Sequence, residues 1–328
     1  MIDLSGQKIL FIAPKFYSYH TQIIDFMESK SGSVTFYPED IYSPLYRFFN
    51  KLFPAVAARF KERYRNTIIE SVSPNAYDIV FVIRGGILSP SAMESLRQKL
   101  PNAEFVMYQW DSNRQSNYEP IISYFDRVKT FDKEDAQKFG VDYIPLFYTK
   151  KYGEVAKNKR PKRYDLVFYG AYHSDRLDVI KHIDTFCQAN GLIFKHHLYI
   201  TKMALFRLLC FGVVKFKDLG YLKTYSVGMD EILNVYKESL ATLDIELTIQ
   251  YGLTMRTFEA LGAGLKLITT NKNIKDEPFY NDQNITILDR NHLHIDLDFF
   301  KNDFQSDLAF ERYLFENWFN NVFEEDKR

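Results

Sequence analysis

The chain has 328 residues, and its 42 basic side chains (Lys and Arg) balance its 42 acidic ones (Asp and Glu) to a formal net charge of zero. The length suggests about two domains, and the ordinary contents of hydrophobic (46%) and charged (26%) residues exclude wholesale disorder. The zero net charge excludes a globally basic nucleic-acid-binding protein, so no nucleic acid is expected among the partners.

Short apolar runs alternate with helical patterns along the first half of the chain, as expected for βα units. Runs such as IVFVI and EFVMYQW are apolar at consecutive positions, which is typical of parallel strands covered on both faces. The expected strands are residues 8–13, 34–37, 78–83, 104–110, 128–131 and 143–146. The expected helices are residues 20–29, 46–70, 90–99 and 133–139.

Residues 150–163 (KKYGEVAKNKRPKR) differ from the segments on either side. They carry seven basic side chains, one acidic side chain and a proline, and they show no apolar periodicity. A stretch of this composition is typical of a linker between domains or of a surface loop.

The βα alternation restarts after this stretch. The expected strands are residues 165–169, 193–197, 241–246, 265–269 and 285–288, and the expected helices are 175–190, 229–239, 254–262 and the acidic, amphipathic 304–324. We therefore predict an α/β protein with two Rossmann-like domains, residues 1–150 and 151–305, whose parallel sheets face each other across a cleft. A C-terminal helix, 306–328, is expected to pack back on the first domain.

Ligands of open α/β sheets bind beyond the carboxyl ends of the strands, so the loops at these ends are the candidate sites. In YGAYHSDR (169–176) a glycine permits a tight turn, and the serine or the aspartate can cap the next helix. The amide end of that helix, with a histidine and an arginine beside it, suits an anionic phosphate, although a plain turn with a helix cap explains the same residues. The candidate contacts are Gly170, His173, Ser174 and Arg176.

A second candidate lies in residues 244–264, where a strand ending in carboxylates precedes YGLTMRTFEALGAG. Gly252 is expected to form a turn, and Thr254 to cap a helix that places Arg256 and Glu259 on one face. The helix dipole disfavours a cation near the helix N-terminus, so Arg256 needs an anionic partner, which a diphosphate would supply. A local pair with Glu259 on a solvated face is the alternative.

Two loops of the first half also carry polar residues after a strand. In YQWDS (108–112), Asp111 suits a general base or a carboxylate that binds an acceptor, and a helix cap is the alternative. Arg84 and two glycines follow the strand IVFVI, where they allow a close approach of backbone to ligand; the simpler interpretation is an ordinary turn.

Several motifs are missing from the sequence. It has no GxGxxG after the first strand, no GxxxxGK[ST], no GxSxG and no HExxH, so dinucleotide-binding, P-loop and common hydrolase functions lack support. Cys187 and Cys210 have no partners at zinc spacing, so no metal site is expected. The most apolar run, 203–214, is too short to span a bilayer, and no signal peptide is present, which favours a cytoplasmic protein.

The pattern GMDEILNVYKESLATLDIE followed by YGLTMRTFEALGAGLKLITTN resembles the donor-binding half of GT-B glycosyltransferases. It is most similar to the group-1 and CgeB-like proteins of bacterial capsule, lipopolysaccharide and exopolysaccharide synthesis, and YQWDS, TFDKEDA and GAYHSDR extend the resemblance over most of residues 100–290. The resemblance implies transfer of a sugar from a nucleotide-activated donor, held by the second domain, to a glycan or lipid-linked acceptor on the first. It also implies that no metal or other cofactor is needed.

The resemblance also implies roles for individual residues. Glu259 would bind the donor ribose, Arg256 and Thr254 the diphosphate or the sugar, and the 169–176 loop the phosphates from the opposite side. The sequence departs from the retaining-family pattern, because Tyr251 stands where a glutamate is usual. The acid near the reacting centre is therefore expected to be Asp111 or Glu246, and retention or inversion stays open.

Two other functions remain compatible with the same residues. One is a bilobed protein that binds a sugar or nucleotide without catalysis. The other is a sugar-nucleotide epimerase of GT-B shape, which would isomerise its substrate in both directions and need no acceptor.

The zero net charge hides two basic segments with bulky apolar residues. Residues 45–65 and 195–223 each hold six basic side chains and one acidic one. This composition is typical of segments that lie on anionic membranes, so both predict a peripheral attachment to the inner face of the plasma membrane. The alternative is that their apolar residues belong to the core and their cations are solvated.

Overall fold

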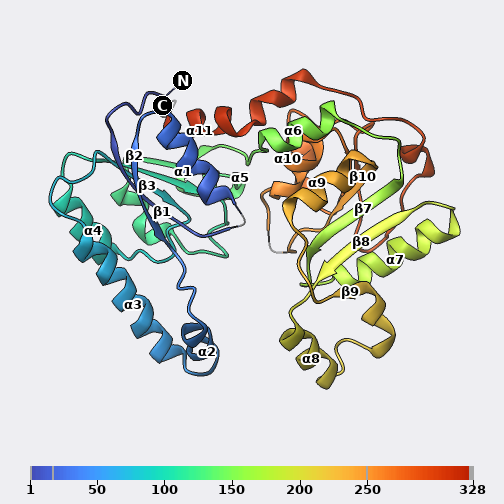
Figure 1. Ribbon diagram of the computed structural model, residues 1–328, viewed down its shortest axis with the longest axis horizontal. Helices are drawn as coiled ribbons and strands as arrows, with labels where there is room; N and C mark the ends of the chain where they lie inside the picture. Colours follow the sequence, from blue (N-terminus) through green and yellow to red (C-terminus); the bar gives the residue numbers. More distant parts are fainter. Residues whose placement is uncertain (1, 17, 249, 325–328) are drawn as a thin grey trace. The chain divides into compact units, whose positions relative to one another are not determined.

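The computed structural model describes residues 2–16, 18–248 and 250–324 (Figure 1). The chain divides into two compact units. Unit 1 comprises Met1–Pro145 and Phe319–Arg328, and unit 2 comprises Leu146–Trp318. The chain therefore leaves unit 1 once and returns to it for its last residues.

Unit 1 is built around a six-stranded parallel sheet with the strand order β2-β1-β3-β4-β5-β6. Its strands are β1 (Lys8–Ala13), β2 (Ser33–Pro38), β3 (Ile79–Ile83), β4 (Glu104–Gln109), β5 (Arg127–Thr130) and β6 (Asp142–Tyr143). Its helices are α1 (Tyr19–Ser29), α2 (Pro44–Leu52), α3 (Pro54–Ser71), α4 (Pro90–Lys99), the 3-10 helix η1 (Glu119–Tyr124) and α5 (Lys133–Phe139).

The end of the chain completes the core of unit 1. Phe81, at the centre of the fully buried strand β3, stacks on Phe11 with 5.2 Å between ring centroids. The same ring meets Phe319 and Phe323 of α11 (Phe315–Phe323) at 6.0 and 5.0 Å, and Phe319 also meets Phe26 of α1 at 5.0 Å. Aromatic contacts of this kind join α11 to β1, β3 and α1 in one core.

Unit 2 repeats the architecture with a second parallel sheet of strand order β12-β11-β10-β7-β8-β9. Its strands are β7 (Tyr164–Ala171), β8 (Phe194–Tyr199), β9 (Leu222–Lys223), β10 (Ser239–Asp244), β11 (Lys266–Thr269) and β12 (Ile285–Ile287). Its helices are α6 (Lys150–Lys157), α7 (Arg176–Ala189), α8 (Lys202–Cys210), α9 (Met229–Lys237), α10 (Met255–Gly262) and the 3-10 helices η2 (Phe216–Tyr221), η3 (Lys272–Asp276), η4 (Leu297–Phe300) and η5 (Leu308–Tyr313).

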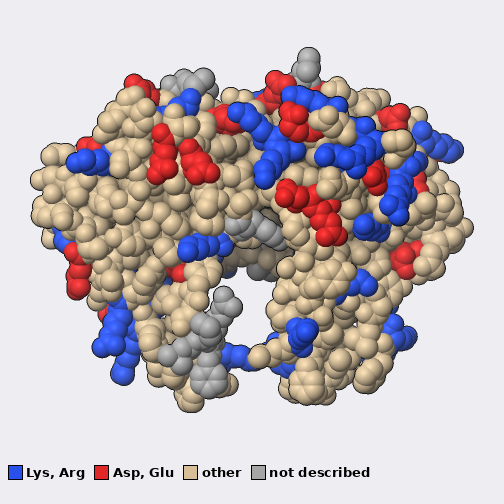
Figure 2. Space-filling model, in the orientation of Figure 1, with Lys and Arg blue, Asp and Glu red and all other residues tan. Residues whose placement is uncertain are grey.

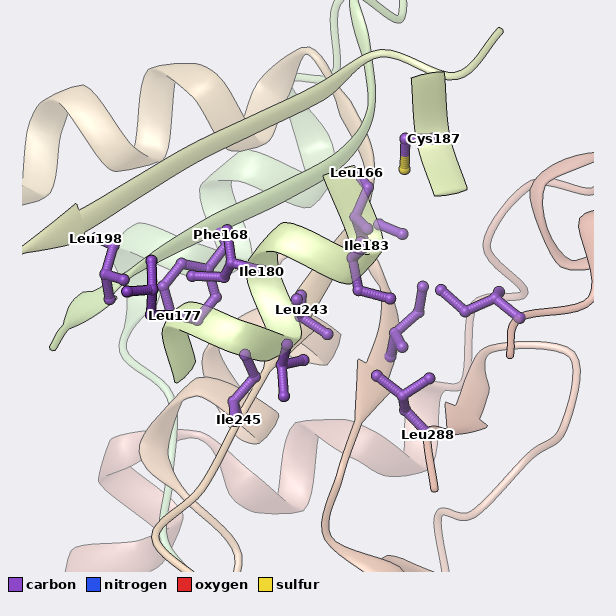
Figure 3. Packing of buried hydrophobic residues seen from close by; sticks show 14 of the residues in the cluster. Leu166, Phe168, Leu177, Ile180, Ile183, Cys187, Leu198, Leu243, Ile245 and Leu288 are labelled. Atoms are coloured by element: carbon purple, nitrogen blue, oxygen red, sulfur yellow. The ribbon is translucent and has the colours of Figure 1, made fainter. Parts of the chain in front are cut away.

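One face of α7 supplies much of the core of unit 2. Figure 3 shows Leu177, Ile180 and Ile183 of this helix pointing toward strand residues such as Phe168 and Leu243. The spacing of three between the helix residues keeps them on one side of α7, while the strands present every second residue to it. Both sheets are parallel and helix-covered, which confirms the predicted α/β class.

The strand orders locate the candidate sites before any side chain is considered. In unit 1 the chain runs from β1 outward to β2 and then crosses to β3, and in unit 2 it runs from β7 to β8 and β9 before crossing to β10. The loops after β1 and β3, and those after β7 and β10, therefore lead in opposite directions. Such switch points leave a crevice beside the carboxyl ends of the strands.

The basic stretch 150–163 does not join the two units, so its interpretation as a linker is wrong, whereas residues 158–163 do form an exposed loop. Its first half forms α6, which belongs to unit 2. Tyr152 and Val155 are buried on one face of that helix. Two apolar residues three positions apart are enough to anchor a helix of eight residues, and the surrounding lysines hide this short pattern in the sequence.

Two other predicted helices are interrupted. The expected helix 46–70 is two helices, α2 and α3, which meet at Phe53 and Pro54. Proline lacks a backbone N–H and disfavours the helical conformation in the residue before it, and Phe53 is accordingly non-helical (φ −138°, ψ 71°). In the expected helix 304–324, only α11 is α-helical, and the 3-10 helix η5 precedes it.

Among the described residues, no helix combines the length and the apolar character that a bilayer-spanning segment needs.

Two helical glycines lie against the ring of Tyr148 and provide a test of the packing in unit 2. A Cβ on Gly262 would fall 2.4 Å from Tyr148 Cγ, whereas a Cβ on Gly153 would lie 3.7 Å from Tyr148 Cε2. Gly262→Ala should therefore lower the free energy of unfolding by about 1–3 kcal/mol through overpacking. Gly153→Ala should leave it unchanged or raise it by up to about 1 kcal/mol, because alanine favours the helix.

Urea unfolding followed by circular dichroism measures both changes. Equal stability of the Gly262→Ala variant and the unmodified protein would contradict the described packing of Tyr148.

Candidate functional site

The loop after β7 is shaped by a close approach of Arg176 to the strand. Gly170 lies within β7 itself, and a Cβ there would fall 2.8 Å from Phe168 Cζ and 3.0 Å from Arg176 Nη1. The turn expected at Gly170 occurs instead at Ser174, whose φ of 42° is in the left-handed region. Glycine is thus needed at position 170 because the ring of Phe168 and the guanidinium of Arg176 occupy the space of a side chain.

Arg176 joins the ends of the two central strands. Its Nε and Nη2 donate to the carbonyl of Ile245, after β10, at 2.8 and 2.5 Å, and its Nη1 donates to the carbonyl of Ala171 at 2.9 Å. The side chain is 93% buried, and within the described part of the chain no carboxylate lies within ion-pair distance of it. Burial and the nearby guanidinium of Arg256 lower the pKa of Arg176 to about 9, so it is charged at neutral pH.

Asp244, the last residue of β10, is a fully buried hydrogen-bond acceptor. It accepts from Thr254 Oγ1 at 2.6 Å, from Arg256 Nη1 at 3.1 Å and from Thr257 Oγ1 at 3.3 Å. Arg256 also donates to the carbonyl of Tyr169 in β7. The start of α10 is therefore fixed to both central strands by one carboxylate and one guanidinium.

These contacts bear on two predictions made from the sequence. Arg256, for which a diphosphate or Glu259 was expected as the anionic partner, forms an ion pair with Asp244. The hydroxyl of Thr254 donates to Asp244 and makes no capping bond to α10, and neither Ser174 nor Asp175 caps α7 through its side chain.

A second buried network surrounds Arg290, which follows β12. Its Nη2 donates to Glu246 Oε1 at 3.1 Å and to Thr270 Oγ1 at 3.1 Å, and its Nη1 pairs with Asp175. Thr270 donates to the other carboxylate oxygen of Glu246. Burial raises the pKa of Glu246 despite these bonds, whereas the bond from Arg290 lowers that of Asp175 against the effect of burial.

His173 lies in the electrostatic field of all three arginines. Its Nδ1 is 2.8 Å from Ser174 Oγ. Burial, followed by the charges of Arg176, Arg256 and Arg290, lowers the pKa of His173 to about 4, although Asp175 opposes them. The ring is therefore neutral at pH 7, and the three guanidiniums add to the effect of burial.

The remaining donor-side candidates lie on the same edge of unit 2. Burial and the neighbouring carboxylate of Glu259 on α10 raise the pKa of Tyr152 well above its usual range. Gly252 is buried, and its carbonyl accepts from Gln250 Nε2 at 2.9 Å and from Asn271 Nδ2 at 3.3 Å. The structure thus places Gly170 near the end of β7 and the other candidates on the loops and helices that follow β7 and β10. These are His173, Ser174, Arg176, Glu246, Gly252, Thr254, Arg256 and Glu259.

Asp111 belongs to a different cluster, at the carboxyl edge of the sheet of unit 1. Arg84, with a φ of 71°, lies among three carboxylates: Nε is 3.1 Å from Glu39, Nη2 is 2.7 Å from Asp40 and Nη1 is 3.8 Å from Asp111. Asp111 pairs with this arginine, and it precedes no described helix that it would cap. The edge gathers the ends of β2, β3 and β4.

Burial raises the pKa of two carboxylates of this edge. It raises the pKa of Glu39 to about 7 against the attraction of Arg84, and it also raises the pKa of Asp111, whose side chain is 34% exposed. Among the described atoms, Glu39 Oε2 and Gln109 Oε1 are buried acceptors without a hydrogen-bond partner. Trp110 beside Asp111 meets Phe16 with 6.0 Å between ring centroids. Carboxylate acceptors beside aromatic faces suit a ligand rich in hydroxyl groups.

Four residues of these clusters were not recognised as functional from the sequence. In the sequence, Asp244 is one of several carboxylates at the end of a strand, with nothing to distinguish it. Glu39 follows a strand whose loop contains no recognisable motif. Arg290 and Thr270 lie in loops without a motif, and only the order of strands β10, β11 and β12 brings them to Glu246. No group of three or more His, Cys, Asp and Glu residues in the described chain could hold a metal ion.

No protein-family model matches this sequence, and a search of curated proteins gave no match either. Solved structures are similar along almost the whole chain. The apo form of the lipopolysaccharide outer core galactosyltransferase WaaB aligns over 96% of this chain and 98% of its own, with a TM-score of 0.55 and 14% sequence identity.

Two further structures give similar alignments. An alpha-glucosyltransferase in complex with UDP and a 13-mer DNA containing a central A:G mismatch aligns over 97% of this chain and 90% of its own (TM-score 0.52, 11% identity). The catalytic domain of starch synthase IV from Arabidopsis thaliana, bound to ADP and acarbose, aligns over 97% and 94% (TM-score 0.51, 10% identity). At these identities the similarity shows the fold alone, and the protein has the two Rossmann-like domains of the GT-B fold.

Proposed function

We propose that this protein is a glycosyltransferase that moves a sugar from a nucleotide-activated donor to a glycan or lipid-linked acceptor in the synthesis of a bacterial surface polysaccharide. The fold supports a transferase, since the similar structures include a galactosyltransferase, a glucosyltransferase with UDP and a starch synthase with ADP. The resemblance of FEALGAG and GAYHSDR to group-1 and CgeB-like proteins supports the surface-glycan role.

The observation that carries the proposal is the group of guanidiniums beneath the β7–α7 loop. Among the described residues the printed partners of Arg176 are carbonyl oxygens, and Arg256 lies near the same Phe168 ring. Burial and these charges lower the pKa of His173 to about 4. A positive loop at the N-terminus of the 14-residue helix α7 suits a diphosphate.

The same charges would assist the transfer itself. A bond forms between the acceptor oxygen and the sugar C1 while the bond from C1 to the diphosphate oxygen breaks, and the electron pair leaves with the nucleoside diphosphate. Fixed positive groups stabilise the negative charge that develops on this leaving group. We assign His173, Ser174 and Arg176 to the diphosphate and Glu259, backed by Tyr152, to the ribose hydroxyls.

Glu246 and Arg256 take a different part in this proposal. Both oxygens of Glu246 already accept hydrogen bonds within the protein, and Arg256 is bonded to Asp244 and Tyr169. We assign them to positioning: Glu246 orients Arg290, and Arg256 holds the start of α10 with Thr254 and Gly252 beside it. The acid of the reacting centre is then Asp111 alone.

The edge of unit 1 supports an acceptor site. Asp111 is partly exposed next to Trp110, and the carboxylate of Asp40 lies on the same arginine. We propose that Asp111 binds the acceptor hydroxyl and accepts its proton as the new bond forms. Its raised pKa makes it a better base than an exposed aspartate.

Replacement of His173 tests the donor site without removing a buried charge. His173→Ala should weaken the binding of UDP, ADP or GDP, whichever binds the unmodified protein, by about tenfold or more, since a contact to a charged group is lost. Isothermal titration calorimetry measures the affinity, and thermal unfolding checks the fold. His294→Ala, an exposed histidine elsewhere on unit 2, is the control and should bind normally. Equal affinity of both variants for every nucleotide would contradict the assignment.

The pKa of His173 provides a second test of the donor site. The diphosphate of UDP-glucose keeps the same charge between pH 5 and pH 8. Its binding should raise the pKa of His173 from about 4, because its negative charge offsets the positive charge of the guanidiniums. Binding then takes up a proton, so the affinity should be higher at pH 5 than at pH 8. An NMR titration of the His173 ring, assigned by its loss in His173→Ala, measures both values. A pKa that UDP-glucose leaves unchanged would exclude contact with the diphosphate.

Asp111→Asn separates catalysis from donor binding. The variant should bind nucleoside diphosphate as the unmodified protein does. Its rate of sugar transfer, measured as nucleoside diphosphate released from the sugar nucleotide, should fall by at least about 100-fold, because the base is lost. Asp126→Asn is the matched control. Asp126 also forms an ion pair with an arginine, Arg97, but it precedes β5 and therefore lies at the amino edge of the same sheet. Unchanged turnover by Asp111→Asn would remove Asp111 from the mechanism, and isomerisation of the sugar nucleotide without transfer would support an epimerase.

A further inference from the structure

Helix α8 and the loop after it form a surface that is apolar on its outer side; residues 202–217 are called the α8 surface below. Five large apolar side chains on it are between 60% and 80% exposed, and α8 has no buried residue among those described. They are Met203, Phe206, Phe211, Val213 and Phe216. So many bulky apolar side chains in one short segment are unusual on a soluble surface.

The packing of unit 2 does not account for these side chains. The inner side of α8 is formed by Ala204, Leu205, Leu208 and Leu209, which lie partly buried against the core. One apolar face is sufficient to attach a helix to a domain. The outer face, which begins with Met203 and Phe206 one turn apart, is a second apolar face that the described chain leaves uncovered.

The charges of the α8 surface have one sign. Lys202, Arg207, Lys215 and Lys217 are exposed, and no acidic residue occurs between positions 202 and 217. The next acid along the chain, Asp218, is buried and pairs with Lys181 at 2.7 Å. Figure 2 shows only tan and blue atoms over the end of unit 2 that carries α8 in Figure 1.

This combination selects one occupant. A second copy of the chain, docked through the same surface, would bring four cations against four cations, which opposes association. An anionic bilayer offers both an apolar interior for the aromatic side chains and phosphates for the lysines and the arginine. We infer that the α8 surface binds anionic membranes, with its phenylalanines inserted at the level of the acyl-chain boundary.

The other basic segment, residues 45–65, supports the same inference less well. Leu52, Phe53 and Val56 are exposed, but Glu62 is exposed among the cations, and Lys61 donates inward to the carbonyl of Gly86 at 2.6 Å. The side chains of residues 45, 47 and 48 lie outside the described part. The inference is therefore restricted to the α8 surface.

Membrane binding goes beyond the proposed sugar transfer and does not depend on it. A transferase that used a lipid-linked acceptor would gain from attachment, because its substrate would be confined to the same surface. Loss of vesicle binding would nevertheless leave donor binding and turnover as they are.

Sedimentation with vesicles tests the inference on the full chain. The unmodified protein should sediment with vesicles of phosphatidylcholine and phosphatidylglycerol at low salt, and not with phosphatidylcholine alone. In the variant with Phe206→Ser, Phe211→Ser and Phe216→Ser, the affinity for the mixed vesicles should fall by at least about tenfold. Arg207→Gln with Lys215→Gln should weaken binding and reduce its dependence on salt.

Ile193→Ser is the matched control, because Ile193 is an exposed apolar residue just before β8, at the opposite end of that strand from α8. This variant should bind vesicles as the unmodified protein does. Binding that is equal for the two lipid compositions, absent from both, or retained by the triple serine variant would overturn the inference. So would a dimer in analytical ultracentrifugation that the triple serine variant loses, because it would identify a second copy as the occupant.

Discussion

The buried carboxylate of Asp244 is the constraint on which the carboxyl edge of the sheet of unit 2 depends. It ends the central strand β10 and accepts hydrogen bonds from Thr254, Arg256 and Thr257 at the start of α10. A carboxylate removed from water is stable only with a full set of donors, so these side chains have little freedom to move. Arg256, held in this way, reaches the carbonyl of Tyr169 and ties β7 to the same point.

This arrangement places two guanidiniums on one aromatic ring. The carbon atoms at the centres of the Arg176 and Arg256 guanidiniums lie 5.7 and 5.5 Å from the centroid of the Phe168 ring, whose π face attracts both cations. Arg176 donates to carbonyl oxygens, and Arg256 donates to the carboxylate of Asp244. Like charges are thus fixed close together before a ligand arrives, which is the condition for electrostatic preorganisation.

The sequence predicted most strands correctly because continuous apolar runs such as IVFVI leave few alternatives for a buried strand. The prediction was wrong for α6, where many lysines surround the two buried apolar residues Tyr152 and Val155. It was also wrong for the expected helix 46–70, which Pro54 divides into two helices. The candidate residues in the loops after β7 and β10 were predicted from motifs. Arg290 was not, because its position depends on the pairing of distant strands, which no local pattern records.

The return of the chain to unit 1 at Phe319 has a consequence for folding during synthesis. Unit 2 is continuous in sequence, from Leu146 to Trp318, and it can form its core as soon as it has left the ribosome. Unit 1 is made first, yet its core lacks the rings of Phe319 and Phe323 until these residues have been made. Unit 2 can therefore mature before unit 1, and removal of residues from 319 onward would damage unit 1.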